Sequence, residues 1–136
     1  MAELHINSEK VQTVSTPEAL YAFLIDFRNF ASILPEDKVE NFVATDNHCS
    51  FDIRGITKLT ISVQEKEENK RIVYISNGLM KFDFTLDVRF FNEAEKSTAT
   101  IAMLANLNPF IKAMAEKPLR QLVDSMANKL ARMQVD

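Results

Sequence analysis

Residues 109–134 read PFIKAMAEKPLRQLVDSMANKLARMQ, and their pattern predicts one long amphipathic helix. Apolar side chains recur at spacings of three and four residues over four turns, which places them along one helix face. Asn108 can cap this helix and Pro109 suits its first turn, whereas Pro118 should kink or restart it because proline lacks an amide hydrogen. The apolar positions are Leu119, Leu122, Val123, Met126, Leu130 and Met133. A helix with such a face must cover apolar surface elsewhere in the fold.

The residues before this helix are typical of strands joined by short turns. The strongest strand is KFDFTLDVRFF at residues 81–91, where apolar and polar side chains alternate, as they do in a sheet with one buried face. Residues 65–70, EKEENK, read as a charged loop, and NEAEKS at 92–97 reads as a turn. The predicted strands are seven, at residues 5–15, 39–45, 49–54, 57–65, 71–76, 81–91 and 98–106.

A shorter helix interrupts the strands near residue 17. Ser15 or Thr16 can cap it, Pro17 suits its first turn, and a further short helix is expected up to Leu34, where Pro35 stops it. The predicted order is therefore β-α-α-β6-α. We expect an α+β fold in a single domain over residues 1–136, with a curved seven-stranded antiparallel sheet wrapped around the long terminal helix.

Composition and charge exclude several classes of function. A chain of 136 residues with net charge -3 and no basic cluster lacks the positive surface that phosphate backbones require, so we expect no nucleic-acid partner. No run of residues is long and apolar enough to span a membrane, and a cytoplasmic location is expected. Cys49 is the single cysteine, and His5 and His48 lack neighbours at ligand spacing, so neither a disulfide nor a metal site is expected.

The stretch STPEALYAFLIDFRNFASILP, followed by strands and a terminal helix, resembles the helix-grip fold of the START-like superfamily. This superfamily (Bet v 1-like, SRPBCC) groups pollen-allergen relatives, lipid-transfer domains and polyketide cyclase-like proteins. The resemblance implies an internal cavity between the sheet and the last helix, used for apolar or amphipathic molecules. The chain has only two glycines and no tryptophan, so the ligand chemistry of the pollen-allergen branch is not carried over. The matching positions are Ser15, Pro17, Glu18, Leu24, Asp26, Phe27 and Pro35.

If the sheet and the helix face each other, their apolar side chains line this cavity. The alternative is that the same side chains fill a dry core, because protein interiors normally pack densely. Methionines favour a pocket, since their unbranched side chains adapt to irregular ligands. The predicted lining residues are Leu59, Tyr74, Phe82, Phe84, Leu86, Met103, Met114, Leu122 and Met126.

Charged residues on the strand at 81–91 allow two interpretations. Asp83, Asp87 and Arg89 alternate with the phenylalanines and can form either a catalytic carboxylate pair or a solvated outer face with weak ion pairs. Regular alternation favours the solvated face. Tyr74 and Arg54 are candidates to orient a ligand if their side chains point inward.

These observations favour a non-catalytic binder of a small apolar molecule, without a cofactor and without assigned catalytic residues. One alternative is a cyclase/dehydratase-like or hydrolase-like enzyme that uses the same cavity. The other is a protein-protein interaction module, for instance a homodimer, that pairs through edge strands or through the surface of Phe110, Ile111 and Met114.

Overall fold

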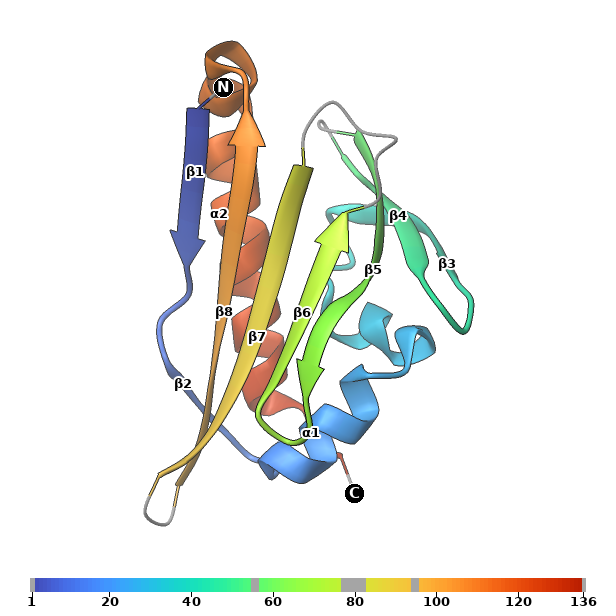
Figure 1. Ribbon diagram of the computed structural model, residues 1–136, viewed down its shortest axis with the longest axis vertical. Helices are drawn as coiled ribbons and strands as arrows, with labels where there is room; N and C mark the ends of the chain where they lie inside the picture. Colours follow the sequence, from blue (N-terminus) through green and yellow to red (C-terminus); the bar gives the residue numbers. More distant parts are fainter. Residues whose placement is uncertain (1, 55–56, 77–82, 94–95, 136) are drawn as a thin grey trace.

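The computed structural model describes residues 2–54, 57–76, 83–93 and 96–135. Within them, eight strands form one antiparallel sheet in the order β1-β8-β7-β6-β5-β4-β3, and β2 also pairs with β8 (Figure 1). The strands are β1 (Ala2–Asn7), β2 (Val11–Thr13), β3 (Val39–Ala44), β4 (Cys49–Ile53), β5 (Thr57–Glu67), β6 (Arg71–Ser76), β7 (Asp83–Glu93) and β8 (Lys96–Leu107). The helices are α1 (Pro17–Leu24), the 3₁₀ helix η1 (Phe27–Ile33) and α2 (Pro109–Arg132).

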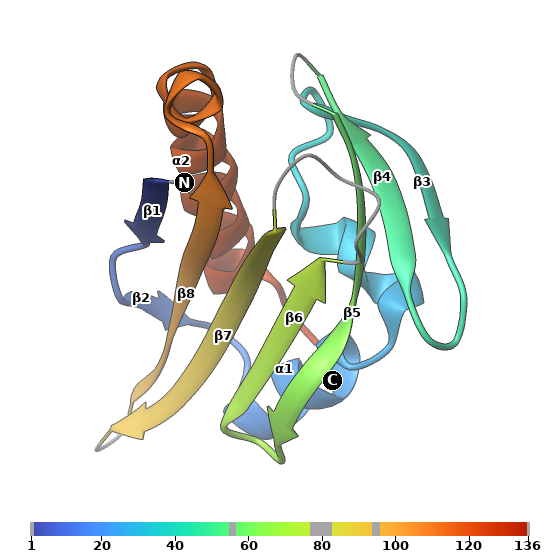
Figure 2. The same ribbon diagram turned by 45° about the horizontal axis from the view of Figure 1, so that its top comes forward.

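The three helices lie on the concave face of the curved sheet. Helix α2 packs against β8, β1 and β2, while η1 packs against β3 and β4 and also touches α2. Figure 2 shows α2 lying along one half of the sheet, with α1 and the following residues beneath the other half. The predicted α+β helix-grip architecture is confirmed.

The first strand differs from its predicted form. One strand was expected at residues 5–15, whereas β1 begins at Ala2 and β2 follows after a break, so eight strands are described instead of seven. Ser8 holds the break to the sheet: its backbone N–H donates to the Ile101 carbonyl at 2.8 Å, and its Oγ accepts from the Ile101 N–H at 2.9 Å. Both segments therefore pair with the one long strand β8.

Side-chain caps set the helix starts where the sequence predicts them. Thr16 Oγ1 accepts from the Ala19 N–H at 3.2 Å, and Asn108 Oδ1 accepts from the Ile111 N–H at 2.8 Å. Ser15, the other predicted cap, has a different role. Its Oγ donates to the Met133 carbonyl at 2.7 Å and accepts from the Val135 N–H at 2.8 Å, which ties the end of α2 to the start of α1.

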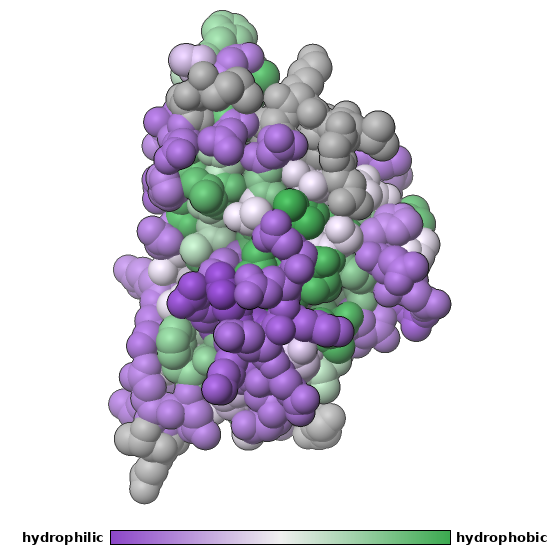
Figure 3. Space-filling view, viewed as in Figure 1, coloured by the Kyte–Doolittle hydropathy of each residue, from purple (hydrophilic) through white to green (hydrophobic). Residues whose placement is uncertain are grey.

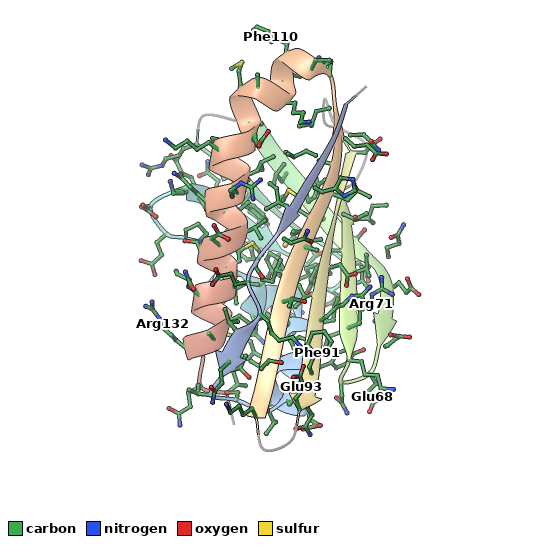
Figure 4. The ribbon with its side chains drawn as sticks, turned by 90° about the vertical axis from the view of Figure 1, so that its left-hand side faces the viewer. Glu68, Arg71, Phe91, Glu93, Phe110 and Arg132 are labelled. Atoms are coloured by element: carbon green, nitrogen blue, oxygen red, sulfur yellow. The ribbon has the colours of Figure 1, made fainter. Side chains whose placement is uncertain are left out.

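Helix α2 continues through Pro118 and does not restart there. Proline at this position supplies no amide hydrogen to the Met114 carbonyl, which favours bending. Figure 4 shows the turns around Phe110 inclined to the rest of the helix, as expected for such a bend.

Candidate functional site

Strand register aligns apolar side chains in rows across the concave face of the sheet. Tyr74 on β6 is paired with Leu86 on β7, Leu86 with Met103 on β8, and Met103 with Ile6 on β1. A second row includes Phe84, which pairs with Ala105. Since α2 packs on this face, the rows and the helix enclose one interior.

Seven of the nine predicted lining residues lie in this interior. Each is at most 2% exposed, and all belong to one continuous apolar core. Phe82 lies outside the described residues. Met114 is 63% exposed. The seven residues are Leu59, Tyr74, Phe84, Leu86, Met103, Leu122 and Met126.

Helix phase explains the position of Met114. Ala115, Leu119 and Leu122 follow one another at spacings of four and three residues, and all three are buried, so they define the face of α2 that meets the sheet. Met114 is four residues after Phe110, and both side chains are exposed on the outward face. Met114 therefore lies away from the interior that Leu122 and Met126 cover.

A cluster of aromatic rings fills the interior beneath η1, and the sequence-based set of lining residues missed most of it. Phe30 lies 5.0 Å from Tyr74 and 6.4 Å from Phe51 between ring centroids, and Phe27 lies 5.8 Å from Tyr74. The spacing of Phe27 and Phe30 predicts that they share one apolar face, and both are buried. Their meeting with Tyr74 depends on the tertiary fold.

The polar groups of this interior are few and uncharged. Tyr74 Oη donates to the Leu24 carbonyl at 3.0 Å, and burial raises the pKa of its phenol well above the ordinary value. Burial also raises the pKa of the Cys49 thiol to about 12. Ser76 Oγ accepts from the Phe84 N–H at 3.0 Å and has its own hydroxyl hydrogen to donate. The interior is therefore apolar, with isolated hydrogen-bonding groups.

The outer face of the sheet carries the charged residues, in agreement with the solvated interpretation. Asp87 accepts two hydrogen bonds from Arg71, at 3.0 and 3.1 Å, and one from Arg89 at 3.0 Å. Asp83 is exposed, and Arg54 pairs with Glu40 at 2.6 Å on the surface. Figure 3, which views this face, shows hydrophilic side chains over much of its lower half.

An open cavity of about 620 Å³ lies apart from the interior, where the β5–β6 turn, the end of β7 and the start of α1 meet. Figure 4 labels four of its residues, Glu68, Arg71, Phe91 and Glu93. None of the predicted lining residues belongs to it. Several of its charges are already paired: Glu93 contacts Lys10, and Arg71 and Arg89 contact Asp87. Lys10 also lies 4.4 Å from the centroid of the Phe91 ring.

No family model and no curated protein match this chain. Solved structures do match. KanY protein is 13% identical, with a TM-score of 0.74 over 96% of this chain and 97% of that one. A Thalictrum norcoclaurine synthase point mutant, in complex with a transition-state analogue, is 7% identical, with a TM-score of 0.68 over 95% and 94%. StfQ, a di-domain ARO/CYC protein of the steffimycin biosynthetic pathway, is 14% identical, with a TM-score of 0.64 over 93% of this chain and 48% of that one.

These likenesses confirm that the chain has the START-like, Bet v 1-like fold. At identities this low, they establish the fold alone. In the part of the chain that the structure describes, no helix is long and apolar enough to cross a membrane.

Proposed function

We propose that this protein binds a small apolar or amphipathic molecule in the interior between the concave sheet and α2. The observation that carries the proposal is the convergence of apolar side chains from β5 to β8 and from α2 on one interior. Isolated polar groups such as the Ser76 hydroxyl supply orientation. Small-molecule sites in proteins have this composition, mostly apolar with a few polar groups. Two proteins of the same fold, a synthase in complex with a transition-state analogue and an ARO/CYC protein, support a role with small molecules.

Binding requires the interior side chains to move. Tyr74 and Met126 are fully buried and Met103 is 2% exposed, so a ligand must displace groups that now pack together. Met103 and Met126 suit this movement, because an unbranched thioether changes rotamer with little strain. Phe30 and Tyr74, held by ring contacts and a hydrogen bond, form the rigid wall.

The proposal is tested by titrating the native protein with the apolar fluorescent dye ANS. Met126→Trp enlarges a side chain inside the interior, whereas Met114→Trp is the matched control on the exposed face of the same helix. We expect micromolar binding that Met126→Trp weakens at least about tenfold and Met114→Trp leaves unchanged. Absence of binding to the folded protein, or equal effects of the two variants, would falsify the proposal.

A folding control, a second variant and a direct search for a ligand complete this test. Far-UV circular dichroism verifies that Met126→Trp is folded, since added volume in a packed core is destabilising. Phe84→Trp, on the opposite wall of the interior, provides a second variant and should weaken dye binding in the same way. Native mass spectrometry of the purified protein then looks directly for a retained small molecule.

The same two structures, a synthase and an ARO/CYC protein, equally favour the cyclase/dehydratase-like or hydrolase-like alternative, but the described residues of this chain add no observation for it. Acid-base chemistry needs a group that changes protonation near neutral pH. Burial keeps Tyr74 and Cys49 protonated there, because it raises both pKa values. The other buried polar side chains among the described residues are the hydroxyls of Thr13, Ser15 and Ser76. Binding without catalysis is therefore the function that the described interior supports best.

We also propose that the protein is located in the cytoplasm. A free, buried Cys49 suits that reducing compartment.

A further inference from the structure

The two edges of the sheet differ in how regular they are. At one edge, β3 has an irregularity in its pairing with β4 between Glu40 and Val43, where Asn41 has a positive φ of 57°. Such irregularities protect an edge against pairing with a further strand. At the other edge, β1 pairs with β8 in an unbroken register from Ala2 to Asn7. β1 is therefore the edge that is regular enough to accept another strand.

The direction of the backbone groups of β1 follows from its pairing with β8. The Ser8 N–H donates to the Ile101 carbonyl, in the same register as the rest of β1. Backbone groups alternate in direction along a strand, so Glu3, His5 and Asn7 direct theirs away from β8. These three residues therefore offer N–H donors and carbonyl acceptors at the edge of the sheet.

No described element covers this edge. Figure 1 shows β1 at the side of the upper half of the sheet, with α2 behind β8, and Figure 4 views β1 with α2 to one side of it. On the concave face, Leu4 and Ile6 are 3% and 0% exposed. On the outer face, the side chains of Glu3 and His5 are exposed and contact each other at 3.1 Å. The edge thus alternates an apolar residue with a polar pair.

We propose that β1 pairs with β1 of a second copy of this chain, antiparallel and about a two-fold axis at Leu4. In this register Leu4 lies opposite Leu4, and Glu3 of each copy lies opposite His5 of the other. Residues directly opposite on antiparallel strands share one face, so the leucines meet on the concave face and the polar pairs on the outer face. Such a pairing is isologous, and it joins the two sheets into one.

Charge complementarity selects both the occupant and the register. In the proposed register, each carboxylate of Glu3 has an imidazole beside it on its own strand and another across the axis. A shift by one step of the same hydrogen-bonding pattern would place His5 opposite His5 and Glu3 opposite Asn7, without any acid-base pair. An unrelated extended peptide would have to supply the base, the acid and the apolar residue between them. β1 carries all three in the required order.

The expected dimer is weak and depends on concentration. One strand of six residues supplies the contact, and it buries less than the roughly 800 Å² per partner of a standard interface. The net charge of -3 on each copy also opposes association. The pairing therefore belongs to the transient class of interfaces, and it does not depend on any ligand in the interior.

The test is analytical ultracentrifugation of the full chain from micromolar to millimolar concentration. We expect a reversible dimer, and His5→Glu should raise its dissociation constant at least about tenfold because carboxylates then lie opposite each other. Adding Glu3→Lys to that variant exchanges acid and base, and should restore the dimer. The matched control is Val43→Glu, on the other edge strand and 60% exposed, which should leave the dissociation constant unchanged.

A backbone variant tests the pairing without changing the charge pattern of Glu3. His5→Pro removes an N–H that faces away from β8, so the pairing of β1 with β8 is kept while the edge loses a donor. We expect this variant to be monomeric, with a far-UV circular dichroism spectrum like that of the unaltered protein.

Three results would overturn the inference. The first is a chain that stays monomeric over the whole concentration range. The second is a dimer that His5→Glu and Val43→Glu weaken equally. The third is a dimer that the added Glu3→Lys does not restore, because that result assigns the contact to another register or another surface.

Discussion

The two parts of α2 on either side of Pro118 contain similar apolar residues in opposite environments. After Pro118, the helix buries Leu119, Leu122 and Met126 against the sheet. Before it, Ala115 is buried while Phe110 and Met114 face outward. The difference teaches that an apolar side chain is buried only where another element lies opposite it. The sheet and η1 supply that partner for the later turns, and no described element supplies it for the outward face of the first turns.

The largest expected difference is in stability, between Leu122→Ala and Met114→Ala. Leu122 is 2% exposed, so its truncation leaves a cavity and should lower the free energy of unfolding by about 2–5 kcal/mol. Met114→Ala should change it by less than about 0.5 kcal/mol, because the side chain is already in water. Urea unfolding followed by far-UV circular dichroism measures both. Equal losses would show that the Met114 side chain is packed in solution.

Alkaline pH should weaken the closed interior. The pKa of Cys49 is raised from 9.0 to about 12, so the folded state keeps a proton that the unfolded chain loses. Stability from this group is complete below pH 9 and is lost as the pH rises toward 12, by on the order of 2 kcal/mol at about pH 11. Cys49→Ala should lack this loss, so its stability deficit relative to the unaltered protein should shrink as the pH rises. A constant deficit would show that the thiol is not enclosed.

A smaller effect is expected at the rigid wall of the interior. Tyr74→Phe removes the hydrogen bond to the Leu24 carbonyl but keeps the ring. We expect a loss of about 1–2 kcal/mol in thermal or urea unfolding, since a buried carbonyl loses its donor. An unchanged free energy of unfolding would show that water reaches this carbonyl, and hence that the interior is wetter than its exposure values indicate.

The smallest effect belongs to the outer face. Asp87→Asn removes the shared charge partner of Arg71 and Arg89, which are paired across β6 and β7. Because these ion pairs lie at the sheet surface and are only partly buried, the urea midpoint should fall by less than about 0.5 M, and by less still at high salt. A large decrease that is independent of salt would mean that these groups are enclosed.

Much of the fold can be predicted from periodicity and caps. The alternation along β7 and the caps at Thr16 and Asn108 place elements where they are described. Local patterns do not show how strands meet. β5 continues to Glu67 through residues expected to form a loop, because an irregularity between Val63 and Glu65 lets the pairing with β6 resume. Such a shift depends on the partner strand.

The interior residues, too, are predicted only in part from the sequence. The apolar row of the strands predicts inward residues correctly, but RIVYIS is apolar on both faces and cannot show that Tyr74 points inward. Val73 is also buried, at 5% exposed, although it lies on the outer face. Only the pairing of Val73 with Asp87 and of Tyr74 with Leu86 separates the two. The apolar character of Met114 predicts an inward position wrongly, because the spacing from Ala115 to Leu119 sets the helix phase and turns Met114 outward.

The position of β1 affects how the protein folds as it leaves the ribosome. β1 is at the edge of the sheet and pairs with β8, so Leu4 meets Ala105, which lies about 100 residues later in the sequence. All of the strands up to β8 must be synthesised before this pairing can form, and contacts so distant in sequence slow folding. Until then Leu4 and Ile6, both buried in the finished protein, stay uncovered on the nascent chain. The long separation between β1 and β8 therefore gives a chaperone time to bind Leu4 and Ile6.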